Sequence, residues 1–456
     1  ENISENKKKA KISKIIELFF YLLNYRLISY INHCIILTMD NVKQVYATLK
    51  LDDNKVDILV GEFYNTRFNI ICTYSAPISG ISDFNVIDSD SVVEGLKEAI
   101  ANVSKKVGAT LEKVILVLPP YNFSRTSLKV SIIPSDSCIK KKDIARAITN
   151  ALKTHIDDES LVINTHITKY TVNGISYRRL PENETCDEAY IDIDLLCGDK
   201  KMAFDYVEVV NKAGLDILDL VLADYAIAKE SVALENSLSH NIILLNINNE
   251  ETYLSLIYKT KLLSSEIIHT GLRQFCDLAI AKYHLPYNVC SRLLKYNVDY
   301  KSEHLNDAIY AWSDGDKNNS LVIKDLNEMV DVPLNAYVDK IVSTCKPIIE
   351  KGASFLLTGE GSEMLAISEL LKEKSGVEVK NYYPDIIGAR KANMCANYGA
   401  LFVYREKAVL NELSVNCVNI AEYDKTIDRI EEDVEGESIT SKIKNLFETY
   451  KESEEK

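Results

Sequence analysis

Residues 242–252 read Ile242-Ile243-Leu244-Leu245-Asn246-Ile247-Asn248-Asn249-Glu250-Glu251-Thr252. The four apolar residues at the start predict a buried strand, and the apolar run that follows Thr252 predicts a second one. The polar residues between them predict a tight turn. We therefore predict a hairpin of Asn241–Ile247 with Thr252–Tyr258, followed by a strand over Leu262–Ile268.

The first half of the chain opens with a similar pattern. Asp52, Asp53 and Asn54 form a strong turn signal between two apolar runs. A helical period of apolar residues follows, and then a short buried strand that ends at two prolines. The predicted elements are strands Tyr46–Leu51, Lys55–Glu62 and Asn69–Ala76, helix Asp90–Val107 and strand Val114–Leu118.

The block 128–204 interrupts the first half and predicts a small α+β unit. Its predicted elements are helix Lys140–Leu152 and strands Leu161–Tyr170, Thr171–Tyr177 and Tyr190–Leu196. Two helices, Asp205–Ala213 and Asp224–Leu234, then return the chain to the first half over 205–240. In the second half, 241–420, helices dominate to Lys351, and strand Phe355–Leu357 enters the turn Thr358–Ser362. The two halves are predicted to repeat as topology rather than as identity.

Composition excludes some classes of function. The net charge of −14 argues against a nucleic-acid-binding protein, which normally presents a basic face. The 10 cysteines form no CxxC pair, so reduced, buried thiols are expected. No Cys/His pair has ligand spacing, and we predict no metal site.

The two ends of the sequence differ from the rest. The apolar run 15–23 is interrupted by polar residues and is too short for a membrane span of about 20 residues. We predict that 1–38 is a non-native or disordered extension, that translation starts at Met39, and that the first half begins with 39–127. At the other end, the composition predicts an acidic linker over 421–437 and an amphipathic helix over 438–456.

Several short motifs, in order and spacing from Val45 to Arg405, resemble FtsA. FtsA is the bacterial actin-like protein that attaches the FtsZ division ring to the inner face of the membrane. The motifs are Gly61–Gly80, Val172-Asn173-Gly174, Gly214-Leu215 with Leu222-Ala223, Gly271 with Asp277–Ala281, and Ala392–Tyr404. The resemblance implies an α/β, two-lobed actin-like ATPase fold (duplicated, ribonuclease H-like), with a small α+β subdomain inserted in the first lobe. PilM, a pilus-assembly relative, is the nearest competing family.

The resemblance also implies where ATP and magnesium would bind. In such a site, glycine-rich turns cradle the phosphates with backbone N–H groups, and a carboxylate orients the hydrated magnesium ion. The corresponding segments are a first turn (Lys50–Lys55), a second turn (Asn246–Thr252) and a third turn (Thr358–Ser362). The candidate nucleotide-binding residues are Lys50, Asp52, Asp53, Asn54, Asn246, Asn248, Asn249, Thr252, Gly271, Gly359, Glu360, Gly361 and Ser362.

Most of these residues depart from the family pattern. Lys50 stands at the position of an acid, and Asp52 and Asp53 stand at the positions of glycine and Thr/Ser. An unscreened carboxylate about 4 Å from a phosphate costs roughly 1–4 kcal/mol. Alternatively, Asp52 to Asn54 is simply a solvent-exposed turn. In the other segments, Asn246 replaces an acid, Asn248, Asn249, Glu250 and Glu360 replace glycines, and Ser291 and Leu294 replace Glu and Lys.

We therefore predict weak or absent ATP binding, negligible hydrolysis and no catalytic residues, so that ATP with magnesium is a doubtful cofactor. The seven histidines do not pair with a nucleophile in any recognisable pattern.

The resemblance places partner binding in the lobe 271–345, which in FtsA takes the C-terminal peptide of FtsZ. Basic and aromatic side chains there suit an acidic, apolar peptide, although an ordinary solvated helical surface would have the same composition. The candidates are Arg273, Arg292, Lys295, Tyr296 and Lys340, with Lys282, Phe275, Tyr283 and Tyr287 nearby. By the same resemblance, the inserted subdomain contributes to filaments and to contacts with later division proteins.

The C-terminal segment 438–456 suits the surface of an anionic membrane. Its candidate membrane-contacting residues are Ile443, Lys444, Leu446, Phe447 and Tyr450. The glutamates near the end of the chain oppose that attraction, and the alternative is a helix packed on the body of the protein.

The function predicted from the resemblance is a division adaptor, peripheral on the cytoplasmic face of the membrane at the septum. The alternatives are a PilM-like scaffold of a pilus or secretion machine, and an ATP-hydrolysing enzyme or chaperone of the same fold.

Overall fold

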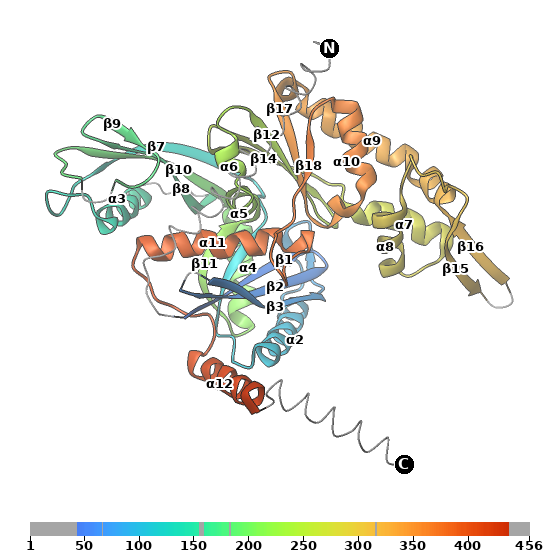
Figure 1. The fold of residues 1–456 in the computed structure, drawn as a ribbon, viewed down its shortest axis with the longest axis horizontal. Helices are drawn as coiled ribbons and strands as arrows, with labels where there is room; N and C mark the ends of the chain where they lie inside the picture. The colour runs from blue at the N-terminus through green and yellow to red at the C-terminus, as the bar shows by residue number, and fades with distance from the viewer. Residues whose placement is uncertain (1–42, 66, 155–158, 182–183, 315–316, 437–456) are drawn as a thin grey trace, which may run out of the picture.

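The structure is a computed structural model, and it describes residues 43–65, 67–154, 159–181, 184–314 and 317–436 (Figure 1). The first half is built on a five-stranded sheet in the order β11-β6-β1-β2-β3. Its strands are β1 (Gln44–Asp52), β2 (Lys55–Tyr64), β3 (Arg67–Pro77), β6 (Lys113–Leu118) and β11 (Asp216–Leu222). β1, β2 and β3 pair antiparallel, whereas β6 runs parallel to β1 and to β11.

The second half repeats this arrangement. Its five-stranded sheet has the order β14-β13-β12-β17-β18, with the same alternation of antiparallel and parallel pairs. The strands are β12 (Asn241–Ile247), β13 (Thr252–Tyr258), β14 (Lys261–Ile268), β17 (Ala353–Thr358) and β18 (Val379–Asn381). The predicted two-lobed α/β fold is thereby confirmed, and the predicted bounds of β12 and β13 agree with those of the structure.

Helices complete each half. In the first half, the hairpin β4 (Ile81–Ser82) with β5 (Asn85–Val86) and helices α2 (Ser89–Val107), α4 (Lys200–Lys212), α5 (Ala223–Glu230) and α6 (Ala233–Asn236) surround the sheet. Helix α11 (Cys395–Leu410) also packs on this sheet, because its Tyr398 and Phe402 rings contact Phe68 of β3.

The second half carries a larger addition between β14 and β17. It consists of α7 (Leu272–Tyr283), α8 (Tyr287–Asn297), the hairpin β15 (Ala308–Asp314) with β16 (Lys317–Val322), and α9 (Ile323–Ile349). The sequence pattern predicted helices here but not the hairpin. The remaining elements are η1 (Glu360–Glu363), α10 (Leu365–Ser375) and η2 (Ala392–Met394).

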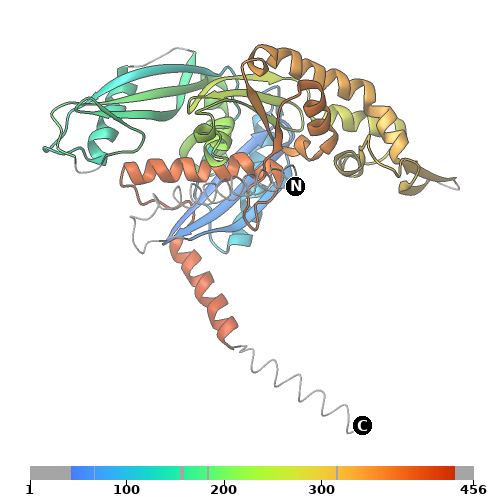
Figure 2. The same cartoon turned by 45° about the horizontal axis from the view of Figure 1, so that its top comes forward.

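The inserted subdomain has a separate four-stranded sheet, in the order β7-β10-β8-β9. Its elements are β7 (Ser124–Ile132), α3 (Lys141–Thr154), β8 (Ser160–Val172), β9 (Ile175–Tyr177) and β10 (Ala189–Asp199). The subdomain therefore begins and ends earlier than 128–204, because Met202, Ala203 and Tyr206 of α4 are buried in the first-half core. In Figures 1 and 2 it lies at the opposite end of the molecule from β15 and β16.

The inserted subdomain is held to the second half by buried polar groups. Asp194 of β10 is almost fully buried and pairs with Arg125 at 3.1 Å and with Lys261 of β14 at 3.4 Å. The His166 ring lies 3.2 Å from the Tyr225 hydroxyl and 2.8 Å from the Thr260 carbonyl oxygen. Burial, with a smaller effect of Lys229, lowers the pKa of His166 to about 4, so the ring is neutral at pH 7.

The segment predicted as an acidic linker is helical: α12 spans Ile420–Gly436 and leaves the first half in Figures 1 and 2. Its first turns pack on that half, with the Tyr423 hydroxyl 3.0 Å from Glu62 Oε2 and the Thr426 hydroxyl 2.7 Å from the Gly108 carbonyl oxygen. These contacts explain why acidic residues remain helical here. The predictions for 1–38, for the start at Met39 and for the helix 438–456 lie outside the described residues.

Candidate functional site

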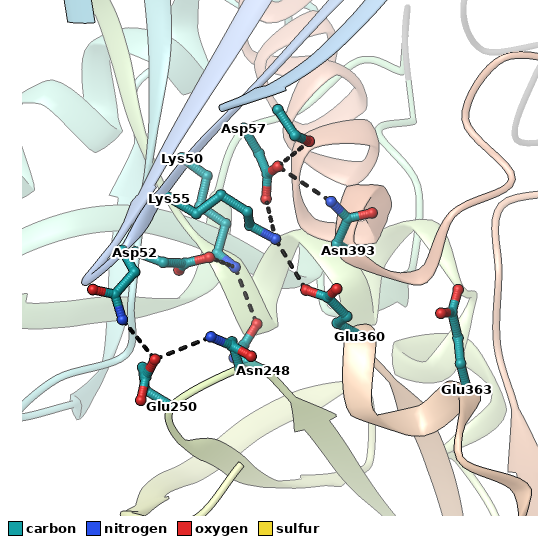
Figure 3. A network of polar contacts seen from close by, with 12 residues as sticks. Lys50, Asp52, Lys55, Asp57, Asn248, Glu250, Glu360, Glu363 and Asn393 are labelled. Carbon is teal, nitrogen blue, oxygen red and sulfur yellow. Dashed lines mark hydrogen bonds and ion pairs between the residues drawn. The ribbon is translucent and has the colours of Figure 1, made fainter. Parts of the chain in front are cut away.

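The three turns singled out by the sequence come together between the two halves of the molecule (Figure 3). The first turn joins β1 to β2, the second joins β12 to β13, and the third follows β17 and forms η1. This convergence follows from the duplicated topology, because β1 and β12 occupy equivalent central positions in their sheets. The structure thus brings together the predicted nucleotide-contacting segments. The side chains of these turns form hydrogen bonds and ion pairs with one another.

Lys50 crosses from the first half to the second. Its side chain is only 3% exposed, and its Nζ lies 2.9 Å from Asp52 Oδ2 and 3.0 Å from Asn248 Oδ1. The negative charge of Asp52 is thereby paired within the turn, and the carboxylate is not the solvent-exposed group of the alternative interpretation. The Asn248 amide in turn donates to the Asn246 carbonyl oxygen at 3.3 Å.

A second contact between the halves lies at the tip of the turns. The side-chain amide of Asn54 donates to Glu250 Oε1 at 2.6 Å, and the amide of Asn249 donates to the same oxygen at 3.0 Å. Asn249 also accepts from the Tyr287 hydroxyl, which ties this turn to α8. Glu250 therefore holds two asparagines that come from different halves.

Glu360 of the third turn is the acceptor of a third contact. Lys55 Nζ lies 3.2 Å from Glu360 Oε2, and Lys295 Nζ lies 2.9 Å from Glu360 Oε1. Burial alone would raise the pKa of Glu360, but Lys55 and Lys295 outweigh burial and lower that pKa to about 2. Lys295 also pairs with Glu363 at 3.1 Å.

Asp57 fixes the position of Lys55 from the other side. Its carboxylate is fully buried, lies 3.1 Å from Lys55 Nζ, and accepts from the Asn393 amide at 3.2 Å and from the Ser75 hydroxyl. Burial would lower the pKa of Lys55, but Asp57 and Glu360 together raise it above its ordinary value. The ammonium is therefore charged throughout the neutral range.

Asn246 and Thr252 lie at the two ends of the second turn, and their side chains form hydrogen bonds within the protein. The Asn246 amide donates to Asp224 of α5 at 3.2 Å, and Ser265 donates to the same carboxylate at 3.0 Å. Burial raises the pKa of Asp224. The Thr252 hydroxyl lies 2.7 Å from the Tyr337 hydroxyl and 2.8 Å from the Thr270 carbonyl oxygen.

The surviving glycines serve close packing of the backbone. A Cβ on Gly271 would lie 2.5 Å from the Asn249 carbonyl oxygen, so the start of α7 presses directly on the second turn. Gly359 has a φ of +83°, and a Cβ there would lie 2.5 Å from the Ile247 carbonyl oxygen. Ser362 is fully buried, and its hydroxyl donates to the Gly359 carbonyl oxygen at 2.7 Å. The preserved third turn is thus packed against β12.

Two further acidic groups lie beside the first turn. Asp53 accepts from the backbone N–H of Asp83 at 2.8 Å, and burial raises the pKa of its carboxyl group. Glu251 is 7% exposed and accepts from the Tyr253 hydroxyl at 2.9 Å. Burial, with Asp52 adding to it, raises the pKa of Glu251 to about 8, so this carboxyl group is protonated at pH 7.

This set of donors and acceptors does not fit a magnesium-bound triphosphate. Lys50 and Lys55 already have carboxylate partners, and Asp52, Glu250 and Glu360 add negative charge at the three turns. Within the described ranges, no group of three or more His, Cys, Asp or Glu side chains is arranged to hold a metal ion.

Sequence reasoning missed Asp57 and Asn393, and it named Lys55 and Glu250 only as parts of the turns and not as candidate site residues. It assigned Lys295 to a partner surface. Lys295 is only 10% exposed and faces the third turn, so its ammonium is engaged inside the site. Ser291 and Leu294, by contrast, are buried in α8. Reading α8 one residue later would have aligned Lys295 with the lysine of the family pattern.

Among the other predicted partner residues, Arg273 borders the network, because its backbone N–H donates to the Asn249 carbonyl oxygen at 2.8 Å. Arg273 pairs with Asp277 at 2.8 Å and lies over the Tyr287 ring, whereas Arg292 and Lys340 are exposed and Tyr296 is 67% exposed. The predicted membrane-contacting residues, 443–450, lie outside the described part of the chain. Among the described helices, none combines the length and apolar character needed to cross a bilayer.

Comparisons with known proteins agree with this architecture. No family model matches the chain. The cell division protein FtsA of Enterococcus faecalis is 22% identical over 435 residues, which cover 88% of this chain and 98% of that protein. The chain is a divergent FtsA-like protein. The FtsA of Bacillus subtilis is also 22% identical, over 233 residues that span 51% of this chain and 53% of the relative.

A solved structure supports the fold of this FtsA-like protein. The PilM–PilN type IV pilus biogenesis complex matches with a TM-score of 0.52 at 12% identity, covering 78% of this chain and 98% of that one. The predicted actin-like fold is confirmed by this likeness, which extends to the fold alone.

Proposed function

We propose that this FtsA-like protein is a cell-division adaptor with weak or lost ATP binding, and not an enzyme. It would link FtsZ filaments to the cytoplasmic membrane, assemble into filaments and recruit later division proteins. The division role is supported by the similarity to FtsA along 88% of the chain. The adaptor role without catalysis is supported by the three turns.

The observation that carries the loss of nucleotide chemistry is the position of Lys50. Its buried ammonium pairs with Asp52 and Asn248, between the two turns that would hold the phosphates. A lysine already neutralised by a carboxylate has little free charge to offer a phosphate. Calorimetric titration with MgATP tests this point, and micromolar affinity would contradict it.

The surface proposed for the FtsZ C-terminal peptide is the exposed side of α8. Arg292 and Tyr296 are four residues apart on this helix, so they lie on one face. An exposed arginine beside an exposed aromatic ring suits a peptide that carries both acidic and apolar side chains. Lys295 is left out of this surface because Glu360 and Glu363 engage it.

The experiment for the division role is a binding assay with the full chain. A fluorescent peptide with the C-terminal sequence of FtsZ from the same organism is titrated, and a scrambled peptide of equal composition is the control. We expect saturable binding of the first peptide only. Equal binding of both peptides, or of neither, would contradict the proposal.

Membrane attachment is proposed for the segment 438–456 on its sequence alone. Deleting residues 440–456 from a fluorescent fusion should release the protein from the membrane into the cytoplasm. Unchanged localisation of the shortened fusion would argue against anchoring by this segment.

The second candidate, a PilM-like scaffold, is favoured by the likeness to the PilM–PilN structure. Such a scaffold would bind a peptide from the N-terminus of a partner protein. The same titration with an N-terminal peptide of that kind separates the two candidates, because each predicts binding of one peptide only.

A further inference from the structure

We propose that three side-chain contacts replace a bound nucleotide as the link between the turn ends of the two halves. The contacts are Lys50 with Asn248, Asn54 with Glu250, and Lys55 with Glu360 (Figure 3). We call them the interlobe clasp. This inference concerns the chain without any ligand, and it holds whether or not FtsZ is the partner.

Each contact of the clasp joins the first half to the second. The paired residues are 198, 196 and 305 positions apart in the sequence. The lobes of an actin-like fold would otherwise meet at these turns through the phosphates and the metal ion of the nucleotide. In this chain, ammonium and amide groups make the same connection directly.

The apolar core does not make the turns close. Leu244, Tyr253 and Ile257 of the second sheet are buried with the first-half core, so the bodies of the two sheets are joined by hydrophobic contact. The turns also hold the buried apolar residues Leu51 and Ile247, but the three contacts that cross between the halves at the turns are polar. The contact between the turns of the two halves therefore depends on the hydrogen bonds and ion pairs that those polar groups form with one another.

Three members of the clasp are held in place by a group of their own half. Asp52 positions the Lys50 ammonium, Asp57 positions the Lys55 ammonium, and Lys295 positions Glu360. Such fixed side chains lose less conformational entropy when they pair across the halves. The clasp is thus preorganised, as a nucleotide site would be.

The ammonium groups of the clasp pair with carboxylates, whereas Glu250 accepts from two asparagine amides. Lys50 has Asp52, Glu360 has Lys55 and Lys295, and Lys55 has Asp57 as well. A triphosphate would have to break these pairs and then lie close to the carboxylates left behind. The clasp therefore accounts for the poor fit to MgATP.

The test is hydrogen exchange of the full chain, followed by mass spectrometry. Three variants are compared with the original chain: Asn54→Ala, Glu360→Gln and Lys374→Ala. Lys374 is the control, because it also forms a side-chain contact, but its partner Asp339, at 2.7 Å, belongs to the same half. Each sample is measured with and without MgATP.

In the original chain we expect the amides of the three turns to be protected without ligand, and MgATP to leave them unchanged. Asn54→Ala and Glu360→Gln should speed exchange in the turns of both halves about fivefold, as for the loss of roughly 1 kcal/mol. Lys374→Ala should leave the turns unchanged. Glu360→Gln keeps the shape of the side chain, so it retains the packing of η1.

Unprotected turns in the original chain would overturn the proposal, and so would protection that appears only with MgATP. Faster exchange confined to the half that carries the substitution would also contradict it. Circular dichroism establishes that each variant is folded before exchange is measured. Loss of FtsZ-peptide binding with an intact clasp would count against the proposed function alone.

Discussion

Lys55 Nζ lies 3.2 Å from Glu360 Oε2, although the two residues are 305 positions apart and belong to different halves of the molecule. This relationship gives a structural role to Glu360, one of the residues that the resemblance to FtsA aligns with a glycine. Glu360 lies in the third turn, and its carboxylate forms an ion pair with the ammonium group of Lys55 at the end of the first turn. The two halves are thereby joined by side chains of the chain itself.

The coupling between Lys55 and Glu360 is the first prediction. A double-mutant cycle with Lys55→Ala and Glu360→Gln should give a coupling free energy of about 1–2 kcal/mol, because both groups are largely shielded from water. The measurement is the free energy of unfolding in urea for the original chain, both single variants and the double variant.

The matched cycle uses Lys374 and Asp339, whose carboxylate side chain is 64% exposed. Its coupling should stay below about 0.5 kcal/mol, as for an exposed pair. Equal coupling free energies in the two cycles would show that the contact between Lys55 and Glu360 stabilises the fold no more than an exposed ion pair does.

The second prediction concerns Glu251, whose pKa is raised to about 8 by burial and by Asp52. The folded protein binds the proton more tightly than the unfolded chain, so this group makes stability fall as pH rises from the ordinary glutamate range to about 8. Glu251→Gln removes the effect. The free energy of unfolding of the variant should exceed that of the original chain by an amount that grows by about 1 kcal/mol per pH unit in this window. Above the window the difference should stay constant.

Thermal unfolding from pH 5 to pH 9 measures this difference. Glu208→Gln is the control, because the Glu208 side chain is 61% exposed and pairs within α4. A difference between the Glu251→Gln variant and the original chain that does not change with pH would contradict a neutral Glu251.

The third prediction concerns His166, whose pKa is lowered to about 4 by burial and by Lys229. Here the unfolded chain binds the proton more tightly than the folded protein does. The contribution of His166 to the free energy of unfolding is therefore fully present above pH 6.5 and is lost as the pH falls towards 4. The loss should amount to about 3 kcal/mol. Because His166 joins β8 to Tyr225 and Thr260, the inserted subdomain should loosen first.

His166→Gln should remove this part of the acid dependence, as followed by urea unfolding at several pH values. His304→Gln, in which the replaced side chain is 74% exposed, should retain it. Parallel profiles for the His166→Gln variant and the original chain would exclude His166 as the group that titrates.

The fourth prediction follows from the proposed function. Arg292→Glu on α8 should raise the dissociation constant for the FtsZ C-terminal peptide about tenfold or more, because it places a carboxylate opposite an acidic peptide. Peptide titration with the full chain measures this.

Lys212→Glu makes the same change of charge on α4 of the first half, where the side chain is 52% exposed, and should leave the affinity nearly unchanged. An equal loss in both variants would indicate a general effect of net charge. No loss for Arg292→Glu would remove α8 from the proposed surface.

Much of the architecture followed from local pattern. The bounds of β12 and β13 and the position of the turn between them are properties of neighbouring residues, since apolar alternation and turn residues act over a few positions. The hairpin β15–β16 was not predicted, because its residues are more polar and its strands are exposed on much of their surface. The helical state of α12 likewise depends on distant contacts with Glu62 and Gly108.

The sequence by itself determined which polar side chains stand in the three turns, because the identity of a side chain at a turn needs no coordinates. Only the tertiary structure decided what these side chains do. Lys50 reaches Asn248 because the packing of the two sheets brings residues 198 positions apart within hydrogen-bonding distance. Lys295 turns inward to Glu360 because α8 and η1 meet within the second half. The burial and the charge state of these side chains depend on tertiary packing, and no local sequence pattern predicts them.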